Sequence, residues 1–141
     1  MNRIVLDTNV VVSGLMRDTG PPAAMVNLFF DQQKVLVVDD RIVAEYREVL
    51  TRPKLALDQL AVTRFLKLLA EVGEVHSGVA VDLPFAMPDA TDRPFAEVAL
   101  QARVDALVTG NLRHFQAMRE HGGVAVLTPA EAVQRFGQGL L

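Results

Sequence analysis

Short apolar runs alternate with amphipathic helical patterns along most of this chain. The apolar runs are rich in Val, Leu and Ile, which is typical of strands buried on both faces, and they cover residues 4–6, 35–38, 106–108 and 124–127. Residues 74–76 predict a further short strand. Helical spacing and end signals predict helices over residues 10–15, 23–32, 40–51, 59–72, 94–103, 112–118 and 129–135. The alternation predicts an α/β fold, with a mainly parallel sheet of about five strands covered by helices on both faces.

We expect one domain over residues 1–137, with residues 138–141 as a loose C-terminal tail. Residues 77–90 are irregular and contain Pro84 and Pro88. No repeat, linker or low-complexity segment is evident in the sequence.

Composition narrows the class of protein without identifying a function. The chain has 141 residues and no Cys, which excludes disulfides and thiolate metal sites and makes a cytoplasmic location the default expectation. No apolar run is long enough for a membrane helix, and we see no signal segment, so no membrane association is expected. A net charge of −3 argues against a general basic coat for nucleic acid. Binding of a polyanion would need a local arginine cluster, or a metal ion in an acidic pocket.

Polar residues follow the predicted strands at their carboxyl ends. Asp7 follows the first strand, Glu45 lies on the helix after the second, and Asp92 precedes the helix before the fourth. Asn111 follows the fourth strand, and Asp89 is a fifth candidate. Ligands of open parallel sheets bind at this rim, so we expect these side chains to gather there.

Carboxylates gathered at one rim repel each other, and a cation is their natural compensator. Oxygen ligands without Cys or paired His favour Mg²⁺ or Mn²⁺ over Zn²⁺. Such an ion supports phosphodiester hydrolysis.

Each candidate also has a purely structural interpretation. Asp7 and Asp92 are suitable helix N-caps, Asp89 a turn residue, and Glu45 a solvated helix residue. Asn111 is equally a turn or cap residue. The joint placement of these residues at one rim favours a site.

Four motifs resemble the PIN-domain family. They are V-L-D-T-N-V at residues 5–10, Glu45 on the helix after the second strand, P-D-A-T-D-R-P-F at 88–95, and L-V-T-G-N-L-R-H-F at 107–115. More narrowly, the chain is similar to bacterial PIN proteins regarded as toxins of toxin–antitoxin pairs, the relatives of VapC-type toxins. The resemblance covers nearly the whole chain.

The resemblance implies a three-layer α/β/α sandwich and a ribonuclease that uses Mg²⁺ or Mn²⁺. Asp7, Glu45 and Asp92 match the acidic metal-binding and catalytic positions, and Asp89 and Asn111 are further candidate ligands. The supporting residues are Thr8, Asn9 and Thr109. The fourth motif of the family often supplies an aspartate where this chain has Asn111 or His114, which predicts weaker metal binding.

The resemblance also implies an RNA substrate, a cognate antitoxin and a homodimer. The basic residues expected to position the RNA backbone are Arg17, Arg93, Arg113 and His114. Each of them has an alternative interpretation as a solvated surface residue.

Two other functions stay open on the sequence. Asn111 favours a PIN-like module that binds RNA or protein with weak or no turnover. An aspartyl-phosphate phosphatase also starts from a strand-end aspartate. Enzymes of that class resembling haloacid dehalogenases carry a second acid two residues later, where this chain has Asn9.

Overall fold

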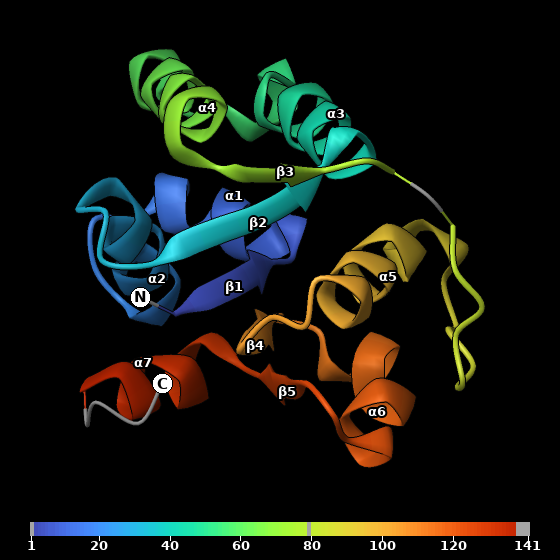
Figure 1. Cartoon of the computed structure of the whole chain (residues 1–141). Coiled ribbons are helices and arrows are strands. Elements are labelled where there is room, and N and C mark those ends of the chain that lie inside the picture. Colours follow the sequence, from blue (N-terminus) through green and yellow to red (C-terminus); the bar gives the residue numbers. More distant parts are fainter. Residues whose placement is uncertain (1, 79, 138–141) are drawn as a thin grey trace.

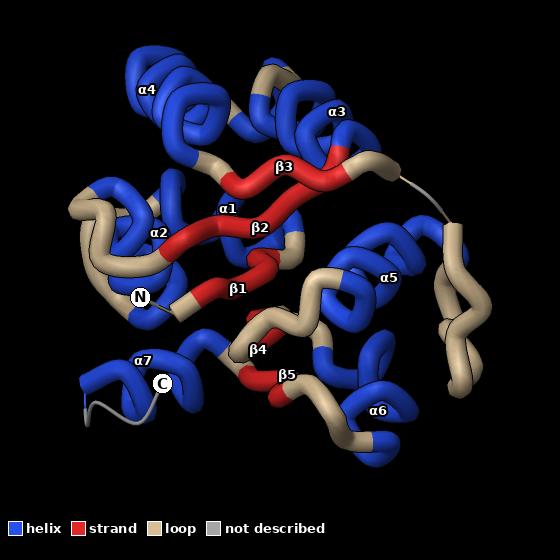
Figure 2. Tube along the Cα trace, in the orientation of Figure 1, coloured by secondary structure: helices blue, strands red, loops and turns tan. Residues whose placement is uncertain are grey.

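Five parallel strands form a single sheet in the structure, a computed structural model that describes residues 2–78 and 80–137. The strands are β1 (Arg3–Leu6), β2 (Val35–Asp39), β3 (Glu74–His76), β4 (Ala106–Val108) and β5 (Ala125–Leu127). Their order across the sheet is β3-β2-β1-β4-β5, and every neighbouring pair is parallel. The predicted α/β class and five-stranded sheet are confirmed, and the sheet is wholly parallel. Figure 2 shows the strands next to one another with helices around them.

The described residues contain seven α-helices and two 3₁₀ segments. The α-helices are α1 (Thr8–Met16), α2 (Pro21–Phe30), α3 (Asp40–Leu50), α4 (Gln59–Val72), α5 (Arg93–Gln101), α6 (Leu112–His121) and α7 (Pro129–Gly137). The 3₁₀ segments, η1 and η2, cover Pro53–Leu55 and Ala90–Asp92. None of these helices combines the length and apolarity needed to cross a membrane. The predicted tail at residues 138–141 lies outside the described part of the chain.

Helix ends account for most differences between the predicted and observed elements. Helix α1 begins at Thr8 rather than residue 10, because the Asp7 side chain accepts a hydrogen bond from the Thr8 backbone N–H and caps the helix. Helix α6 continues to His121 rather than stopping at residue 118. It ends there because Gly122 leaves the helical conformation with a positive φ of 83°, which glycine adopts readily.

Two groups of helices cover the two faces of the sheet. Helix α1 packs on α2 and α3, and α2 packs on α7, whereas α5 packs on β1, β2 and β4 and α6 packs on β5 (Figure 1). Right-handed crossovers place the connections from β1 to β2 and from β2 to β3 on one face. The connections from β3 to β4 and from β4 to β5 lie on the other. The result is the α/β/α sandwich.

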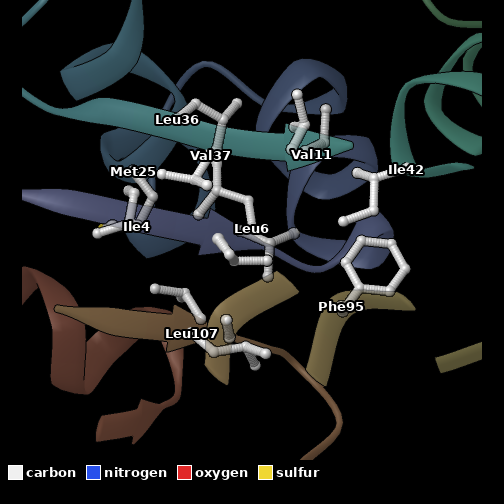
Figure 3. Packing of buried hydrophobic residues seen from close by; sticks show 14 of the residues in the cluster. Ile4, Leu6, Val11, Met25, Leu36, Val37, Ile42, Phe95 and Leu107 are labelled. Atoms are coloured by element: carbon white, nitrogen blue, oxygen red, sulfur yellow. The ribbon is translucent and has the colours of Figure 1, made fainter. Parts of the chain in front are cut away.

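A continuous apolar core fills both interfaces between the sheet and its helices. Ile4, Val5 and Leu6 of β1 are each 0% exposed, as expected for a strand covered on both faces. Figure 3 shows side chains of the central strands meeting Val11 and Met25 from one layer and Phe95 from the other. This core fixes the carboxyl ends of the strands, on which the candidate site is built.

The strand order reverses direction at β1. The chain moves from β1 outward to β2 and β3, then returns to β4 on the other side of β1. In open parallel sheets, the crevice at the carboxyl ends of the strands at such a switch point is the usual place for a ligand. The fold therefore indicates the ends of β1 and β4 as the place to look for a site.

Candidate functional site

A pocket of about 540 Å³ lies at the carboxyl ends of β1 and β4. It is lined by polar residues and a few apolar ones: Asp7, Thr8, Asn9, Val12, Ser13, Glu45, Val49, Arg52, Leu55, Thr91, Asp92, Asn111 and His114. The pocket brings together the three carboxylates expected from the sequence, although they come from positions far apart in the chain. It also holds Asn111 and His114 of the fourth motif.

Asp7 lies at the base of this pocket and is 6% exposed. One carboxylate oxygen caps α1 by accepting the Thr8 N–H at 2.8 Å, and the other accepts the Thr109 hydroxyl at 2.8 Å. Burial raises the pKa of Asp7 to about 6, and the negative charges of Asp92 and Glu45 act in the same direction. Asp7 is therefore both a helix cap and an acidic pocket residue, so its two interpretations are compatible.

Glu45 faces the pocket from α3 and accepts a hydrogen bond from the Thr8 hydroxyl. Its helix is held against β1 by the next residue, Tyr46, which is fully buried and donates its hydroxyl hydrogen bond to the carbonyl of Leu6. This anchor lies directly before Asp7 in the chain. The position of Glu45 relative to Asp7 is thus set by buried contacts rather than by a solvated helix surface.

Asp92 stands at the N-terminal position of α5, but its side chain makes no capping hydrogen bond. Its Oδ2 atom is buried and lies 2.8 Å from His114 Nδ1, without a well-formed hydrogen bond to any group in the described residues. Burial raises the pKa of Asp92, and the proximity of His114 opposes that rise. A buried carboxylate oxygen left in this state is costly, unless another group binds it.

Asp89 behaves as a turn residue and also lies close to Asp92 and His114. Its Oδ1 accepts the Thr91 N–H at 2.9 Å and the Thr91 hydroxyl at 2.8 Å, and the first of these hydrogen bonds chiefly lowers the pKa of Asp89. One ligand atom from each of Asp89, Asp92 and His114 lies within 4.8 Å of the other two. This group adds His114 to the candidate ligands. From the sequence, His114 was expected to contact the phosphates of the RNA backbone instead.

The segment after β4 supports the floor of the pocket. Thr109 is fully buried, and its hydroxyl accepts the Asn111 N–H at 3.0 Å while donating to Asp7. Asn9 accepts the Gly110 N–H at 3.2 Å, which joins the start of α1 to the end of β4. Asn111 stands at the start of α6 without a side-chain cap, and its amide nitrogen lies 3.2 Å from His114 Nε2.

The basic residues expected near the rim are placed differently from one another. His114 lines the pocket, Arg17 and Arg113 are exposed, and Arg93 turns toward Glu97 and the carbonyl of Val81 at 3.4 and 3.3 Å.

Arg52 also lines the pocket, and sequence reasoning missed it. It forms a two-point ion pair with Glu48, at 3.0 and 2.7 Å. The sequence marks Arg52 only as the end of a helix before Pro53, so no pattern indicated a pocket role.

The donor set fits a hard divalent cation. Asp7, Glu45 and Asp92 line one pocket, and Asp92 Oδ2 is buried beside His114 without a well-formed hydrogen bond in the described part of the chain. Among the described residues, neither Asp7 nor Glu45 has a basic side chain within ion-pair distance. Mg²⁺ and Mn²⁺ prefer such oxygen ligands and would compensate the excess negative charge.

Comparisons with known proteins bear on the family and the fold of the chain. A family model described as PIN domain matches residues 3–113 of the chain. An uncharacterized protein of Methanocaldococcus jannaschii, MJ1680, is 25% identical over 143 residues, covering 95% of this chain and 91% of that protein. A chain in the crystal structure of VapBC2 from Rickettsia felis, bound to a DNA fragment from its promoter, has a similar fold with a TM-score of 0.55. The two chains are 12% identical, with 89% of this chain and 98% of that chain covered.

Proposed function

Because the chain belongs to the PIN-domain family, we propose that it is a metal-dependent ribonuclease that hydrolyses RNA phosphodiester bonds. PIN domains are generally nucleases. The observation that carries the proposal is the pocket in which Asp7, Glu45 and Asp92 meet at the switch point of the sheet. Within residues 2–78 and 80–137, no arginine or lysine forms an ion pair with Asp7 or Glu45.

The acidic pocket would hold Mg²⁺ or Mn²⁺ chiefly through Asp7 and Asp92. Glu45 is a further ligand or a base that orients water, and Asp89, Asn111 and His114 are additional candidate ligands. When bound, the ion supplies an activated water and polarises a phosphoryl oxygen. Asp92 Oδ2 supports this assignment, because it is buried, contacts His114 Nδ1 at 2.8 Å without a well-formed hydrogen bond in the described residues, and would be satisfied by a cation.

The other pocket residues prepare these carboxylates. The Thr109 hydroxyl and the Thr8 N–H hold the two oxygens of Asp7, and the Thr8 hydroxyl fixes Glu45. The two hydrogen bonds to Asp7 favour its ionised form, against the burial that opposes ionisation. Asn9 ties the first motif to the fourth through Gly110.

Basic side chains at the pocket would position the RNA backbone. His114 and Arg52 both line the pocket and are the closest candidates for phosphate contacts. Arg17 and Arg113 are exposed and available for contacts farther along an RNA strand. Arg93 would first have to leave Glu97 and Val81.

The biological role that we propose is that of a toxin held inactive by an antitoxin. The similar structure from Rickettsia felis is that of VapBC2 bound to a DNA fragment from its promoter. By analogy, we propose that this chain binds a small cognate antitoxin and forms a homodimer. Growth arrest on expression of the wild type, absent for Asp7→Asn and relieved by a co-expressed neighbouring gene product, would support this role.

Cleavage of a pool of single-stranded and structured RNA tests the enzymatic proposal. Wild type and Asp7→Asn are purified in parallel and assayed with Mg²⁺, Mn²⁺ or EDTA. We expect cleavage by wild type that requires metal and is lost in Asp7→Asn. Metal-dependent cleavage that persists in Asp7→Asn contradicts the site assignment.

The same assay separates the ribonuclease from a binding module. Wild type that binds RNA without cleaving it in any metal would favour the module, and the uncharged Asn111 in the fourth motif would be the reason. A covalent acyl-phosphate on Asp7 would instead support a phosphatase.

A further inference from the structure

A second ionic cluster lies at the carboxyl end of β2, outside the pocket. Asp39 is 0% exposed and Glu97 is 1% exposed, and Arg41 lies between them. Arg41 donates from Nε to Asp39 at 2.8 Å, and its two terminal nitrogens lie 2.7 Å from Asp39 and 2.7 Å from Glu97. We call these three residues the Arg41 bridge. The acidic pocket does not use any of them.

The Arg41 bridge joins the two helices that carry pocket acids. Arg41 is in the first turn of α3, one turn before Glu45, and Glu97 is on α5, five residues after Asp92. Figure 1 shows α3 and α5 on either side of the end of β2, and both helices pack on that strand. The bridge therefore connects the scaffold of Glu45 directly to the scaffold of Asp92.

The outer ends of the bridge are also fixed. Asp39 Oδ1 accepts the Ile42 N–H at 2.9 Å and so caps α3. The second oxygen of Glu97 accepts the Val81 N–H at 3.2 Å. At Gly78, a Cβ atom would approach Asp40 Oδ1 to 2.3 Å and Asp39 Oδ2 to 3.2 Å. Two described residues of the segment after β3, Gly78 and Val81, thus lie against the bridge.

Stability alone does not account for such an arrangement. Removing two carboxylates from water costs several kcal/mol per ion, and well-packed apolar residues are often as stable. An ion pair of this kind adds a fixed relative orientation of the two carboxylates, because the planar guanidinium holds both of them at defined angles. The same two helices also meet through the tilted rings of Tyr46 and Phe95, whose centroids lie 6.4 Å apart. Such apolar packing has less directional preference than the ion pair.

We propose that the Arg41 bridge is a positioning device that sets Glu45 and Asp92 at the separation needed to bind the divalent ion. The proposal rests on the proposed metal-dependent function of the pocket. Arg41 and Glu97 are positioning residues, since they act through the helices and touch neither the pocket nor the substrate. Loss of the Glu97 charge, or of the two-sided guanidinium at Arg41, would let α3 and α5 shift against each other while the core stays packed.

The test compares Glu97→Gln and Arg41→Lys with a control variant that loses stability elsewhere. Val126→Ala on β5 is that control, because Val126 is 2% exposed and contributes nothing to the bridge or the pocket. All proteins are compared at a temperature at which each is folded by circular dichroism. The readouts are Mn²⁺ affinity, kcat and KM for RNA cleavage, and the distance between spin labels on α3 and α5.

The chain has no Cys, so labels at Arg47→Cys and Gln101→Cys, both exposed, report the distance between these helices. In Glu97→Gln and Arg41→Lys we expect a broader or shifted distance distribution, and Mn²⁺ affinity and kcat lower by about 10-fold or more. KM for RNA should stay unchanged, and Val126→Ala should keep the wild-type values.

Two results would overturn the positioning role. One is an unchanged label distance in Glu97→Gln, and the other is an equal loss of Mn²⁺ affinity in Val126→Ala. Failure of wild type to cleave RNA would contradict the proposed function alone, because the label distances and Mn²⁺ affinity still report on the bridge.

Discussion

The charge of Asp7 should destabilise the metal-free protein, and Asp7→Asn should relieve that cost. Asp7 is 6% exposed, and its hydrogen-bond partners Thr8 and Thr109 are neutral. Asparagine has the same shape and can still accept the Thr8 N–H that caps α1. The substitution therefore removes a buried charge while keeping the cap.

The expected magnitude follows from the pKa. A rise from 3.8 to about 6 corresponds to about 3 kcal/mol when Asp7 is fully ionised, which is an upper value. Because the folded-state pKa lies above the unfolded one, the folded state binds more protons between these two values. The free energy of unfolding of wild type should fall as pH rises through that window, and the full cost should be present above it.

Urea unfolding at several pH values in EDTA measures this effect. At pH near 7.5, the free energy of unfolding of Asp7→Asn should be about 1–3 kcal/mol larger than that of wild type. The two free energies should converge toward pH 4. Asp58→Asn is the matched control, because Asp58 also caps a helix, α4, but is exposed to water. The control should change little at any pH.

Addition of Mn²⁺ extends the same experiment. Binding to the folded state should stabilise wild type and leave Asp7→Asn almost unaffected. If Asp7→Asn were less stable than wild type at pH 7.5 in EDTA, or if its advantage did not shrink at low pH, the account of a buried uncompensated charge would be refuted.

Three further predictions concern the packing and the fourth motif. Gly14→Ala should destabilise the protein by about 2 kcal/mol or more in thermal unfolding, because the new Cβ would lie 2.4 Å from Val26 Cγ2. In a helix, replacing glycine by alanine usually increases stability, so a rise in Tm would contradict this close approach. Tyr46→Phe should cost about 1–2 kcal/mol in urea unfolding, since the buried carbonyl of Leu6 loses its hydroxyl donor, and an unchanged midpoint would refute that hydrogen bond. Asn111→Asp should tighten Mn²⁺ binding about 10-fold in calorimetry by adding a charge at the pocket, and weaker binding would show that Asn111 does not face the ion.

The elements of the fold could be predicted closely because their signals are local. The runs at residues 4–6 and 106–108 are short, apolar and buried on both faces, and both appear as strands within one residue of the prediction. The predicted helix ends were less accurate. At α1, for example, the first residue depends on which backbone N–H the Asp7 carboxylate accepts.

The location of the pocket could also be predicted, since parallel strands place their carboxyl ends at one edge. The partners of individual side chains could not. Arg52 lines the pocket through the bend that follows α3, and Arg93 points toward Glu97 rather than toward the rim. His114 approaches Asp92 because α6 starts beside η2, a contact between segments that no local pattern encodes.

The difference between Asp7 and Asp39 shows what distinguishes a candidate site from a structural acid. Both aspartates end a buried strand, cap the following helix and are almost inaccessible to water. Asp39 is neutralised by Arg41, whereas the described partners of Asp7 are a hydroxyl and a backbone amide, and its charged neighbours Asp92 and Glu45 are negative. The sequence alone treats the two residues alike, because the neutralising partner is decided by side-chain geometry. An unneutralised charge at the switch point of the sheet is what makes Asp7 the residue on which a cation would act.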